Sequence, residues 1–306
     1  MDSLLKDIVL RDARRRDPPL ATRRADLVES AARRLPRTSR QRLLMCAPAH
    51  YEVSYAINPW MQGNLHAASA TAAQNQWTLL REVLARHALI ETVAPIDGLP
   101  DMPFTANAGL VRGNRFIPSR FRHAERRGEE TAFTRWFGDA GFEVHTLEPH
   151  IVFEGAGDAL FDDTLDALWI GHGPRSERIA ADAVGRVLDT ETLPLRLVDP
   201  HFYHLDTCFC PLPGGALLWY PPAFDADSRR LVESRIAATR RIAVDERDAR
   251  RFACNAIPLG PALVVHRASG ALKRALDDIG FAVIETPLDE FHKAGGSARC
   301  LTLPLG

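Results

Sequence analysis

The feature that most constrains the fold of this chain is a repeated order of secondary-structure elements. From residue 42 onward the same order recurs: two short apolar strands, a helix and a further strand, with turn residues between them. Hairpins begin near residues 108, 153, 207, 252 and 300, so the intervals are 45, 54, 45 and 48 residues. Intervals of this size are typical of repeat architectures. The sequence therefore predicts an α/β fold of five pseudo-symmetric ββαβ units.

Four of these units are continuous, and the fifth is divided between the two ends of the chain. The first unit has strands at 108–111 and 115–117, a helix at 125–137 and a strand at 142–147. In the second, strands from 153 and at 167–171 precede a helix at 176–188 and a strand at 193–198. The third has a hairpin at 207–220, a helix at 227–239 and a strand at 242–245. The fourth has strands at 253–258 and 262–266, a helix at 270–279 and a strand at 281–286.

The divided unit pairs residues 300–305 with residues 43–47 and continues with a helix at 66–87 and a strand at 90–93. Sharing one unit between the chain ends would close a ring and protect the sheet edges. The alternative is an ordinary α/β protein of two domains, which the length of 306 residues also allows.

Composition and charge divide the chain into two parts. A hydrophobic content of 46%, a charged content of 25% and a net charge of -1 indicate a soluble globular protein. Residues 1–42 hold 12 basic against 6 acidic residues, which leaves 26 against 33 in the rest. We therefore expect a basic N-terminal extension at 1–41 and a folded domain at 42–306. Without an apolar run of about 18 residues or a signal-peptide pattern, a cytoplasmic location is expected.

The five cysteines do not indicate a disulfide framework, because they are odd in number and scattered. Cys208 and Cys210 lack the usual spacing and the second ligand pair of a zinc site, and alternation along a strand explains them better. No metal site and no cofactor are expected.

Chemically reactive residues stand at equivalent positions of the repeats, near the start of each hairpin. They are Asn107, Glu154, His204 with Asp206, and Cys300. A thiol needs a base for activation, and an imidazole needs a carboxylate to fix its tautomer, so Cys300, His204 and Glu154 have the types that covalent catalysis requires. Each residue alone is more often structural, but their coincidence favours one shared site.

The sequence resembles the guanidino-group-modifying enzymes over about residues 42–306. The motifs that carry this resemblance are INPWM at 57–61, PDMPFTANAG at 100–109, FEGAGD at 153–158, HLD at 204–206 and GGSARC at 295–300. The resemblance implies a five-bladed α/β propeller, the pentein fold, closed by the chain ends, so that 42–306 would be a catalytic pentein domain. It also implies a covalent mechanism in which Cys300 attacks the guanidinium carbon, His204 moves protons and Glu154 orients His204.

The same resemblance implies a set of substrate contacts. Asp206 would hold the guanidinium, and Phe104 would form a wall of the pocket. The amino-acid end of the substrate would contact Asn58 and Asp101, and its carboxylate would contact Arg126 and Arg175. The segments 61–66 and 290–297 contain glycine and are expected to be mobile.

Residue 107 separates the members of this family. Deiminases carry an acidic residue where this chain has Asn107, and dimethylarginine dimethylaminohydrolases carry two acids where it has Ala106 and Asn107. An amide can donate a hydrogen bond to a ureido oxygen, whereas an ionised carboxylate only accepts. The chain is therefore most similar to the arginine dihydrolases, which convert arginine to ornithine, carbon dioxide and two ammonia molecules.

Several alternatives stay open at this point. An amidinotransferase, an arginine deiminase, a dimethylarginine dimethylaminohydrolase and a citrulline hydrolase share the same site chemistry. A noncatalytic pentein would act as a binding module, and the basic extension could recruit nucleic acid or a protein. We expect a small-molecule guanidino substrate, no nucleic-acid or membrane partner, and leave a homo-oligomer open.

Overall fold

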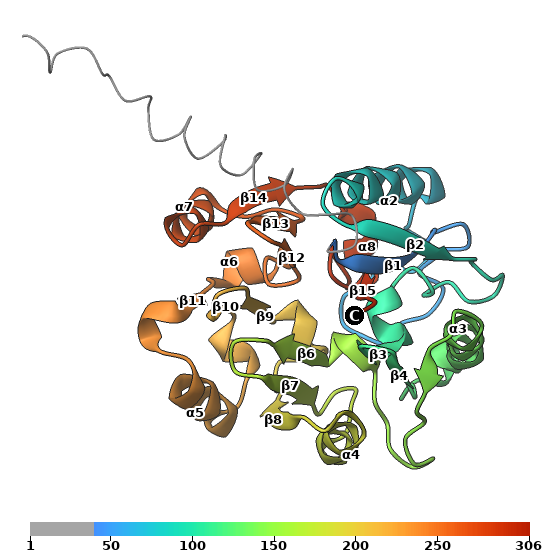
Figure 1. Ribbon diagram of the computed structural model, residues 1–306. Helices are drawn as coiled ribbons and strands as arrows, with labels where there is room; N and C mark the ends of the chain where they lie inside the picture. Colours follow the sequence, from blue (N-terminus) through green and yellow to red (C-terminus); the bar gives the residue numbers. More distant parts are fainter. Residues whose placement is uncertain (1–39) are drawn as a thin grey trace, which may run out of the picture. The chain divides into compact units, whose positions relative to one another are not determined.

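Five three-stranded sheets make up the part of the chain that the structure describes, residues 40–306 of a computed structural model (Figure 1). In every sheet the first two strands run antiparallel, and the third lies parallel to the second. The predicted ββαβ order is therefore present in each unit. The predicted basic extension lies outside the described residues, apart from its last two positions.

The strands of each sheet follow in their hydrogen-bonded order. The sheet formed by both chain ends contains β15 (Leu303–Pro304), β1 (Arg42–Cys46) and β2 (Leu89–Val93). The others contain β3 (Gly109–Arg112), β4 (Arg115–Pro118) and β5 (Glu143–Val144); β6 (Ala159–Asp162), β7 (Ala167–His172) and β8 (Glu191–Arg196); β9 (Phe209–Leu212), β10 (Ala216–Trp219) and β11 (Arg241–Ala243); and β12 (Ile257–Leu259), β13 (Ala262–Val265) and β14 (Ala282–Glu285).

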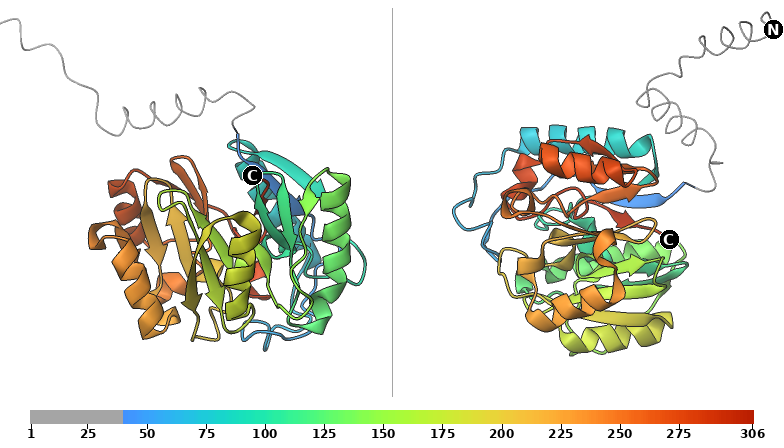
Figure 2. Two further views of the ribbon diagram at one scale, coloured as in Figure 1. Left: turned by 60° about the horizontal axis from the view of Figure 1, so that its bottom comes forward. Right: turned by 90° about the vertical axis from the view of Figure 1, so that its left-hand side faces the viewer.

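One helix connects the two parallel strands of each sheet, and these helices lie outside the sheets (Figures 1 and 2). They are α2 (Ala70–Ala85), α3 (Arg127–Asp139), α4 (Arg178–Leu188), α5 (Ala226–Arg235) and α7 (Gly270–Asp278), with the short helices α6 (Glu246–Ala249) and α8 (Asp289–His292) in other connections. In the sequence Trp77, Leu80, Leu84 and His87 follow the spacing of one helix face, and the first three lie on the buried face of α2. His87, the fourth, lies beyond the end of α2.

Local capping explains where several helices begin and end. The Ser69 hydroxyl accepts a hydrogen bond from Ala72 N, so α2 begins at Ala70 and not near residue 66 as predicted. Asp225 caps α5 in the same way, and Gly280, with a φ of 93°, follows the C-terminal end of α7. The predicted helix at 227–239 ends early, at Arg235.

Four predicted strands are shorter than expected, and in three of them tight turns occupy the first residues. The strand predicted at 142–147 covers only Glu143–Val144, and the strand predicted from 153 begins only at Ala159, after the turn Gly155–Gly157. The strand predicted at 253–258 begins only at Ile257, since Asn255 N bonds to the carbonyl of Phe252. The strand predicted at 300–305 begins only at Leu303, since Thr302 N bonds to the carbonyl of Arg299. The predicted pairing of the chain ends is nevertheless present, with Leu44 opposite Leu303.

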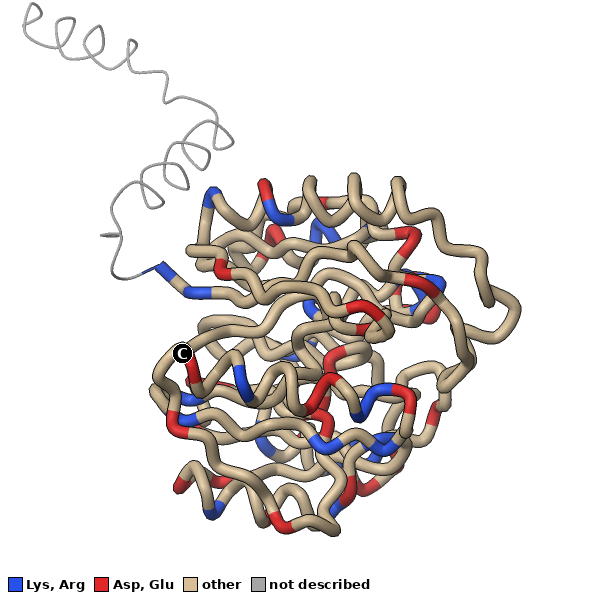
Figure 3. The backbone as a smooth tube through the Cα atoms, turned by 90° about the vertical axis from the view of Figure 1, so that its right-hand side faces the viewer, with Lys and Arg blue, Asp and Glu red and all other residues tan. Residues whose placement is uncertain are grey.

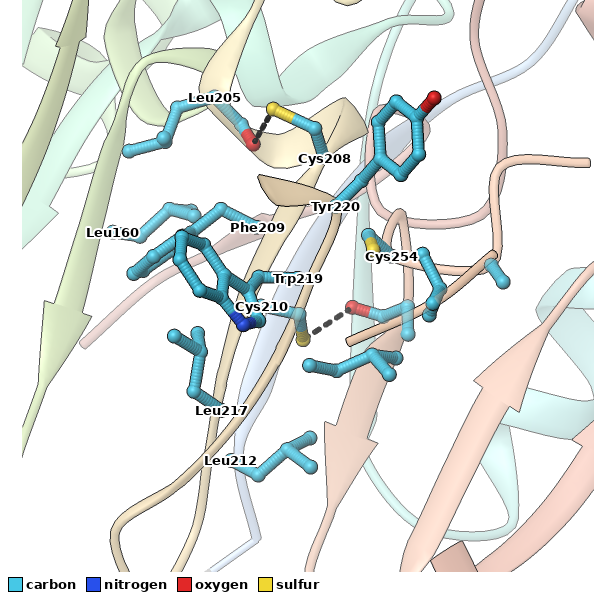
Figure 4. Close-up of a cluster of buried hydrophobic side chains, with 14 of the residues drawn as sticks. Leu160, Leu205, Cys208, Phe209, Cys210, Leu212, Leu217, Trp219, Tyr220 and Cys254 are labelled. Atoms are coloured by element: carbon cyan, nitrogen blue, oxygen red, sulfur yellow. Dashed lines mark hydrogen bonds between the residues drawn. The ribbon is translucent and has the colours of Figure 1, made fainter. Parts of the chain in front are cut away.

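The hydrophobic core lies between the sheets and their covering helices, and one cluster includes three cysteines (Figure 4). The Sγ atoms of Cys208 and Cys210 donate to the carbonyls of Leu205 and Ala256, at 3.6 and 3.7 Å. Phe209 between them is also fully buried, so both faces of this segment are covered, and the alternation predicted for it stays a prediction because β9 begins only at Phe209. All five cysteines are free and buried.

Across residues 40–306 we find no helix with the length and apolar character needed to cross a membrane.

Candidate active site

A tight turn precedes the first strand of each sheet, and these turns carry the reactive side chains. Three are single turns of 3-10 helix: η2 (Thr105–Ala108), η4 (Gly155–Gly157) and η5 (Leu205–Thr207). Asn107 lies in η2, while Glu154 and His204 are the residues directly before η4 and η5. The turns before β12 and β15 hold Asn255 and Cys300. Because the five units repeat, equivalent turns bring side chains from distant parts of the sequence together.

These residues meet at a narrow pocket with a cavity volume of about 10 Å³, the space of roughly one water molecule. Eight of the ten predicted site residues line it, and Glu154 and Asp206 lie directly behind lining residues. The full lining is Ile57, Asn58, Met61, Asp101, Phe104, Asn107, Arg126, Arg175, Tyr203, His204, Ala294, Gly296 and Cys300.

His204 and Glu154 form a buried pair. His204 Nε2 lies 2.7 Å from Glu154 Oε2, and Arg175 Nη1 donates to the same oxygen at 3.0 Å. Burial alone would raise the pKa of Glu154, but Arg175 and the hydrogen bond to His204 outweigh it and hold this pKa well below its usual range. Glu154 is therefore ionised and fixes the His204 ring, which leaves Nδ1 as the nitrogen available for proton transfer.

Cys300 is held by two neighbours. Its Sγ donates to Asp206 Oδ2 at 3.3 Å and accepts from Asn255 Nδ2 at 3.1 Å. Its backbone N–H donates to Asn255 Oδ1, also at 3.1 Å. Burial and the nearby Asp206 carboxylate raise the pKa of the Cys300 thiol well above its usual value. In the unliganded site the sulfur is therefore a protonated thiol that donates to Asp206.

Asp206 has one oxygen without a partner. Its Oδ1 is buried and forms no hydrogen bond with any described residue, while Oδ2 accepts from Cys300. Burial raises the pKa of Asp206 to about 7, although the positive charge of Arg299 opposes this. A buried carboxylate oxygen without a donor is costly, and a cationic donor in the pocket would remove that cost.

The opposite side of the pocket has a second carboxylate of this kind. Asp101 Oδ2 accepts from the Tyr55 hydroxyl at 2.9 Å, but Oδ1 is buried without a partner among the described residues. Arg126 Nε lies 3.7 Å from Asp101 Oδ2. Burial raises the pKa of Asp101, although Arg126 opposes it. The pocket thus has an unpaired acceptor on Asp101 and another on Asp206.

The two arginines of the pocket differ in how much of their donor capacity the protein uses. The Arg126 guanidinium bonds to both oxygens of Glu129, to Asn107 Oδ1 and to the carbonyl of Asp101. Within the described residues, the Arg175 guanidinium bonds only to Glu154 Oε2 and to the carbonyl of Ile57. Since a guanidinium has five N–H donors, Arg175 retains more of them for a ligand.

Asn107 is fixed from both ends of its amide. Its Oδ1 accepts from Arg126 Nη1 at 2.9 Å, so Nδ2 is the donor end, and Nδ2 contacts the carbonyl of Glu154 at 3.3 Å. The second N–H of the Asn107 amide has no hydrogen-bond partner among the described residues. Asn58 and Phe104 complete the wall: Asn58 Nδ2 donates to the carbonyl of Ala294, and Phe104 packs edge-on against Phe291.

Sequence reasoning missed three buried residues of the site. Asn255 contacts Cys300 as described above, and its place before β12 is equivalent to that of Asn107 before β3, a signal the repeat contained. Tyr203 stacks on the Arg175 guanidinium and donates to the carbonyl of Gly295 at 2.9 Å. Asp158 accepts from Ser176 and from Leu205 N, and burial raises its pKa to about 6. Asp158 closes the FEGAGD motif at 153–158, which could have indicated it, whereas no sequence signal indicates Tyr203.

Carboxylates outnumber guanidinium groups in and around the pocket. Five buried acids face only two buried arginines of the described chain, Arg126 and Arg175. The acids are Asp101, Glu129, Glu154, Asp158 and Asp206. The described residues contain no group of three His, Cys, Asp or Glu side chains that could hold a metal ion. The arrangement suits a small cation, with a sulfur and an imidazole positioned for covalent chemistry.

Comparison with known proteins gives one matching family model and several relatives. The model "N,N dimethylarginine dimethylhydrolase, eukaryotic" matches residues 69–306. The bifunctional arginine dihydrolase/ornithine cyclodeaminase AgrE of Nostoc sp. is 53% identical over 266 residues, which cover 87% of this chain but 38% of AgrE. The dimethylaminohydrolase of Mycobacterium tuberculosis is 36% identical over 278 residues, covering 90% of this chain and 89% of that protein.

Solved structures of the N-terminal domain of ArgZ, a cyanobacterial arginine dihydrolase, are also similar to this chain. One is a cysteine-to-serine variant bound to substrate, with a TM-score of 0.86 and 52% identity, covering 87% of this chain and 98% of that domain. Another is an asparagine-to-serine variant covalently bound to a reaction intermediate, with the same TM-score and identity. The chain spans less than two-fifths of the length of full AgrE.

Proposed function

The chain belongs to the N,N-dimethylarginine dimethylhydrolase family of guanidino-group-modifying enzymes, and on this premise we propose that it is an arginine dihydrolase. The proposed reaction converts L-arginine and two water molecules to ornithine, carbon dioxide and two ammonia molecules, without a cofactor. The observation that carries the proposal is the unpaired Asp206 Oδ1 beside the Cys300 sulfur. A guanidinium bonded there would satisfy the buried oxygen and bring its carbon next to the nucleophile.

Substrate binding would also activate the nucleophile. A bound guanidinium would replace the Cys300 thiol as the hydrogen-bond partner of Asp206, and it would add a positive charge beside Cys300. Both changes favour the thiolate form of Cys300 over the thiol. The proton leaves toward His204, whose Nδ1 is free because Nε2 bonds to Glu154. The high pKa of the thiol in the unliganded site is consistent with this order of events.

The covalent steps follow from these positions. The Cys300 thiolate attacks the guanidinium carbon, and the C–N bond to one terminal nitrogen breaks as His204 returns a proton, so that ammonia leaves. Water deprotonated by His204 then attacks the thiouronium carbon and displaces the sulfur, giving a bound ureido compound. A second round at the same carbon releases the second ammonia and a carbamate, which loses carbon dioxide to give ornithine.

The polar groups at the far end of the pocket would hold the amino-acid part of arginine. We assign the α-ammonium group to the unpaired Asp101 Oδ1 and to Asn58, and the α-carboxylate to Arg175 and the remaining donor of Arg126. Phe104 forms the wall along the aliphatic chain. The Asn107 amide would donate to the ureido oxygen, which favours retention of the first product for the second round.

A closed pocket of this size requires movement before arginine can bind. Met61, Ala294 and Gly296 line the pocket, and they belong to the two segments, 61–66 and 290–297, that the sequence predicts to be mobile.

We further propose that the five units close into a five-bladed propeller, a catalytic pentein domain over 42–306. The placement of the sheets in succession around a common centre supports this proposal (Figure 1).

Product analysis by mass spectrometry tests the function. The full chain is incubated separately with arginine, citrulline and dimethylarginine, and the Cys300→Ser variant serves as the control. We expect ornithine and ammonia from arginine without accumulated citrulline, and loss of turnover by at least about 10³-fold in the variant. Citrulline as the end product would indicate a deiminase, and reaction only with an added amine would indicate an amidinotransferase. Turnover close to wild type in Cys300→Ser would exclude the covalent mechanism.

A further inference from the structure

A second and much larger cavity lies at the other end of the same strands. The turns of the active site precede the first strand of each sheet, whereas this cavity is lined by loops that follow it. These loops contain Gly113, Thr164, Gly214 and Gly260, and Gly306 follows β15 in the same position. The cavity volume is about 710 Å³, within the range of small-molecule sites.

The wall of this rear cavity combines apolar and polar side chains. Leu43, Val111, Phe161, Leu212 and Ile257 supply its hydrophobic surface, together with four prolines, and Gln41, Thr164 and Thr302 add uncharged polar groups. A concave wall that combines hydrophobic surface with placed polar groups can hold a small ligand in one orientation. The charged groups therefore decide which ligand such a wall would accept.

Most of those charged groups are already satisfied within the protein. Asp163 pairs with Arg112 at 3.1 Å. Asp162 accepts from the backbone N–H groups of Thr164 and Leu165 and from the Trp169 indole. Both aspartates of the wall, Asp162 and Asp163, and one of its two arginines, Arg112, therefore already have partners within the protein.

Arg299 is the exception among the charged residues that line this cavity. Its side chain forms no hydrogen bond or ion pair with any other residue of 40–306, and its Nε is buried without a partner. Its backbone is fixed, because its N–H bonds to the carbonyl of Asn255 and its carbonyl accepts from Thr302. An unpaired guanidinium that a fixed backbone places on the wall of a cavity is a site for an anion.

We propose that the rear cavity binds a small organic carboxylate, with its carboxylate group on the Arg299 guanidinium and its apolar part against the hydrophobic wall. One guanidinium presents two parallel N–H donors, which match the two oxygens of a carboxylate. Its described wall offers one unpaired positive charge, so a doubly charged phosphate would be left with uncompensated charge against apolar walls.

Binding of a carboxylate to Arg299 would affect the active site electrostatically. Arg299 directly precedes Cys300, and its positive charge favours the ionised form of Asp206. A carboxylate on Arg299 would offset that charge and favour protonated Asp206, which cannot hold a guanidinium. This inhibitory effect rests on the proposed function, whereas binding itself does not.

Titration calorimetry of the full chain with benzoate tests the site. We expect saturable binding of one benzoate, weakened at least about tenfold in Arg299→Gln, since a charge-assisted hydrogen bond contributes about 1.5–3 kcal/mol. Arg112→Gln is the matched control, because that arginine already pairs with Asp163; its affinity should change by less than about twofold. Thr164→Trp, which fills the exposed rim, should also weaken binding and keeps the test valid if Arg299→Gln does not fold.

Several results would overturn the proposal. These are absence of benzoate binding to the wild type, equal affinity in Arg299→Gln, unchanged affinity in Thr164→Trp, or binding of inorganic phosphate as tight as that of benzoate. Calorimetry needs no turnover, so benzoate binding by a chain inactive on arginine would support the site while contradicting the proposed function. Arginine turnover without benzoate binding would support the proposed function and contradict the site.

Discussion

Asn255 holds two atoms of Cys300 at once, the sulfur through Nδ2 and the backbone nitrogen through Oδ1. In the Asn255→Ala variant both bonds are lost and a buried backbone N–H is left unpaired. Because a donor to a thiolate stabilises charge that develops during attack, we expect kcat/KM for arginine to fall about 10²-fold. Steady-state ammonia release measures this fall.

A second measurement separates this role from a general loss of structure. The rate of Cys300 alkylation by iodoacetamide should rise at higher pH in Asn255→Ala than in the wild type, because the thiolate loses a donor. Cys46, which is buried in a different core cluster from Cys254, the chain neighbour of Asn255, serves as the internal control. An unchanged pH dependence of alkylation would show that Asn255 does not stabilise the Cys300 thiolate.

In our interpretation, Asn107 decides whether the ureido compound formed in the first round stays bound for the second round. In Asn107→Asp the donor end of the amide becomes a second carboxylate oxygen, which faces the carbonyl of Glu154 and repels a ureido oxygen. We expect citrulline to accumulate from arginine, with ornithine output reduced by about tenfold or more. Chromatographic product ratios measure this change. An unchanged yield of ornithine would show that this interpretation of residue 107 is wrong.

We expect the ionisation of Asp206 to set the acidic limit of activity. Burial raises its pKa to about 7 in the free enzyme, so Asp206 is largely protonated below that pH and cannot pair with a guanidinium. We therefore expect kcat/KM to rise as the pH increases through about 7. Removal of the Arg299 charge in Arg299→Gln should move this acidic limb to higher pH, because the ionised carboxylate loses its favourable neighbour. Arg112→Gln should leave the limb in place.

The short turn η4 positions the catalytic group at the scale of an element. A Cβ at Gly157 would lie 3.3 Å from His204 Cγ and closer still to Asn107 Nδ2, a side chain that Arg126 already fixes. Gly157→Ala should therefore displace the site and lower kcat/KM by about tenfold or more while the thermal midpoint changes little. Gly138→Ala is the matched control, because a Cβ there meets nothing within 4 Å. Equal effects of the two substitutions would contradict this role of η4.

Helices were easier to predict from the sequence than the turns that carry the site. The 3.6-residue spacing of Trp77, Leu80 and Leu84 is a local signal, and α2 and α7 lie close to their predicted ranges. The turns before β12 and β15 have no periodicity, so their residues were assigned to strands. Asn255 was missed for this reason, although the repeat places it at a position equivalent to Asn107.

The partners of the site residues could not be predicted from the sequence. Residue types indicated that Cys300, His204 and Glu154 could act together, and the structure brings them to one pocket. That Arg126 is largely occupied by Glu129, or that Asp206 contacts the sulfur, depends on side-chain packing. The contact between Asp206 and Cys300 joins residues 94 positions apart, beyond any local pattern.

At the scale of the molecule, buried charged residues of the described domain are distributed differently from its charged residues as a whole. Figure 3 shows acidic and basic positions spread over the domain in that view. Five of the seven buried acids of the described residues, by contrast, lie in or around the pocket, where they outnumber the buried arginines. A field of this sign favours a cationic ligand over an anionic one, in agreement with an arginine substrate. The rear cavity has no such excess of acids: two arginines and two aspartates line it, and among these four Arg299 has no side-chain partner within the described residues.

Stability of the whole domain should depend on the last strand of the chain. β15 covers one edge of β1, and Leu303 and Leu305 are both buried. Deletion of residues 303–306 would expose that edge and remove two buried leucines, a loss of about 3–6 kcal/mol of the 5–15 kcal/mol that is typical of a folded domain. We expect a thermal midpoint lower by several degrees, measured by circular dichroism or calorimetry. Deletion of Gly306 alone, which is exposed, should leave the midpoint unchanged. If removal of 303–306 lowered activity without lowering the midpoint, β15 would position Cys300 and would not support the fold.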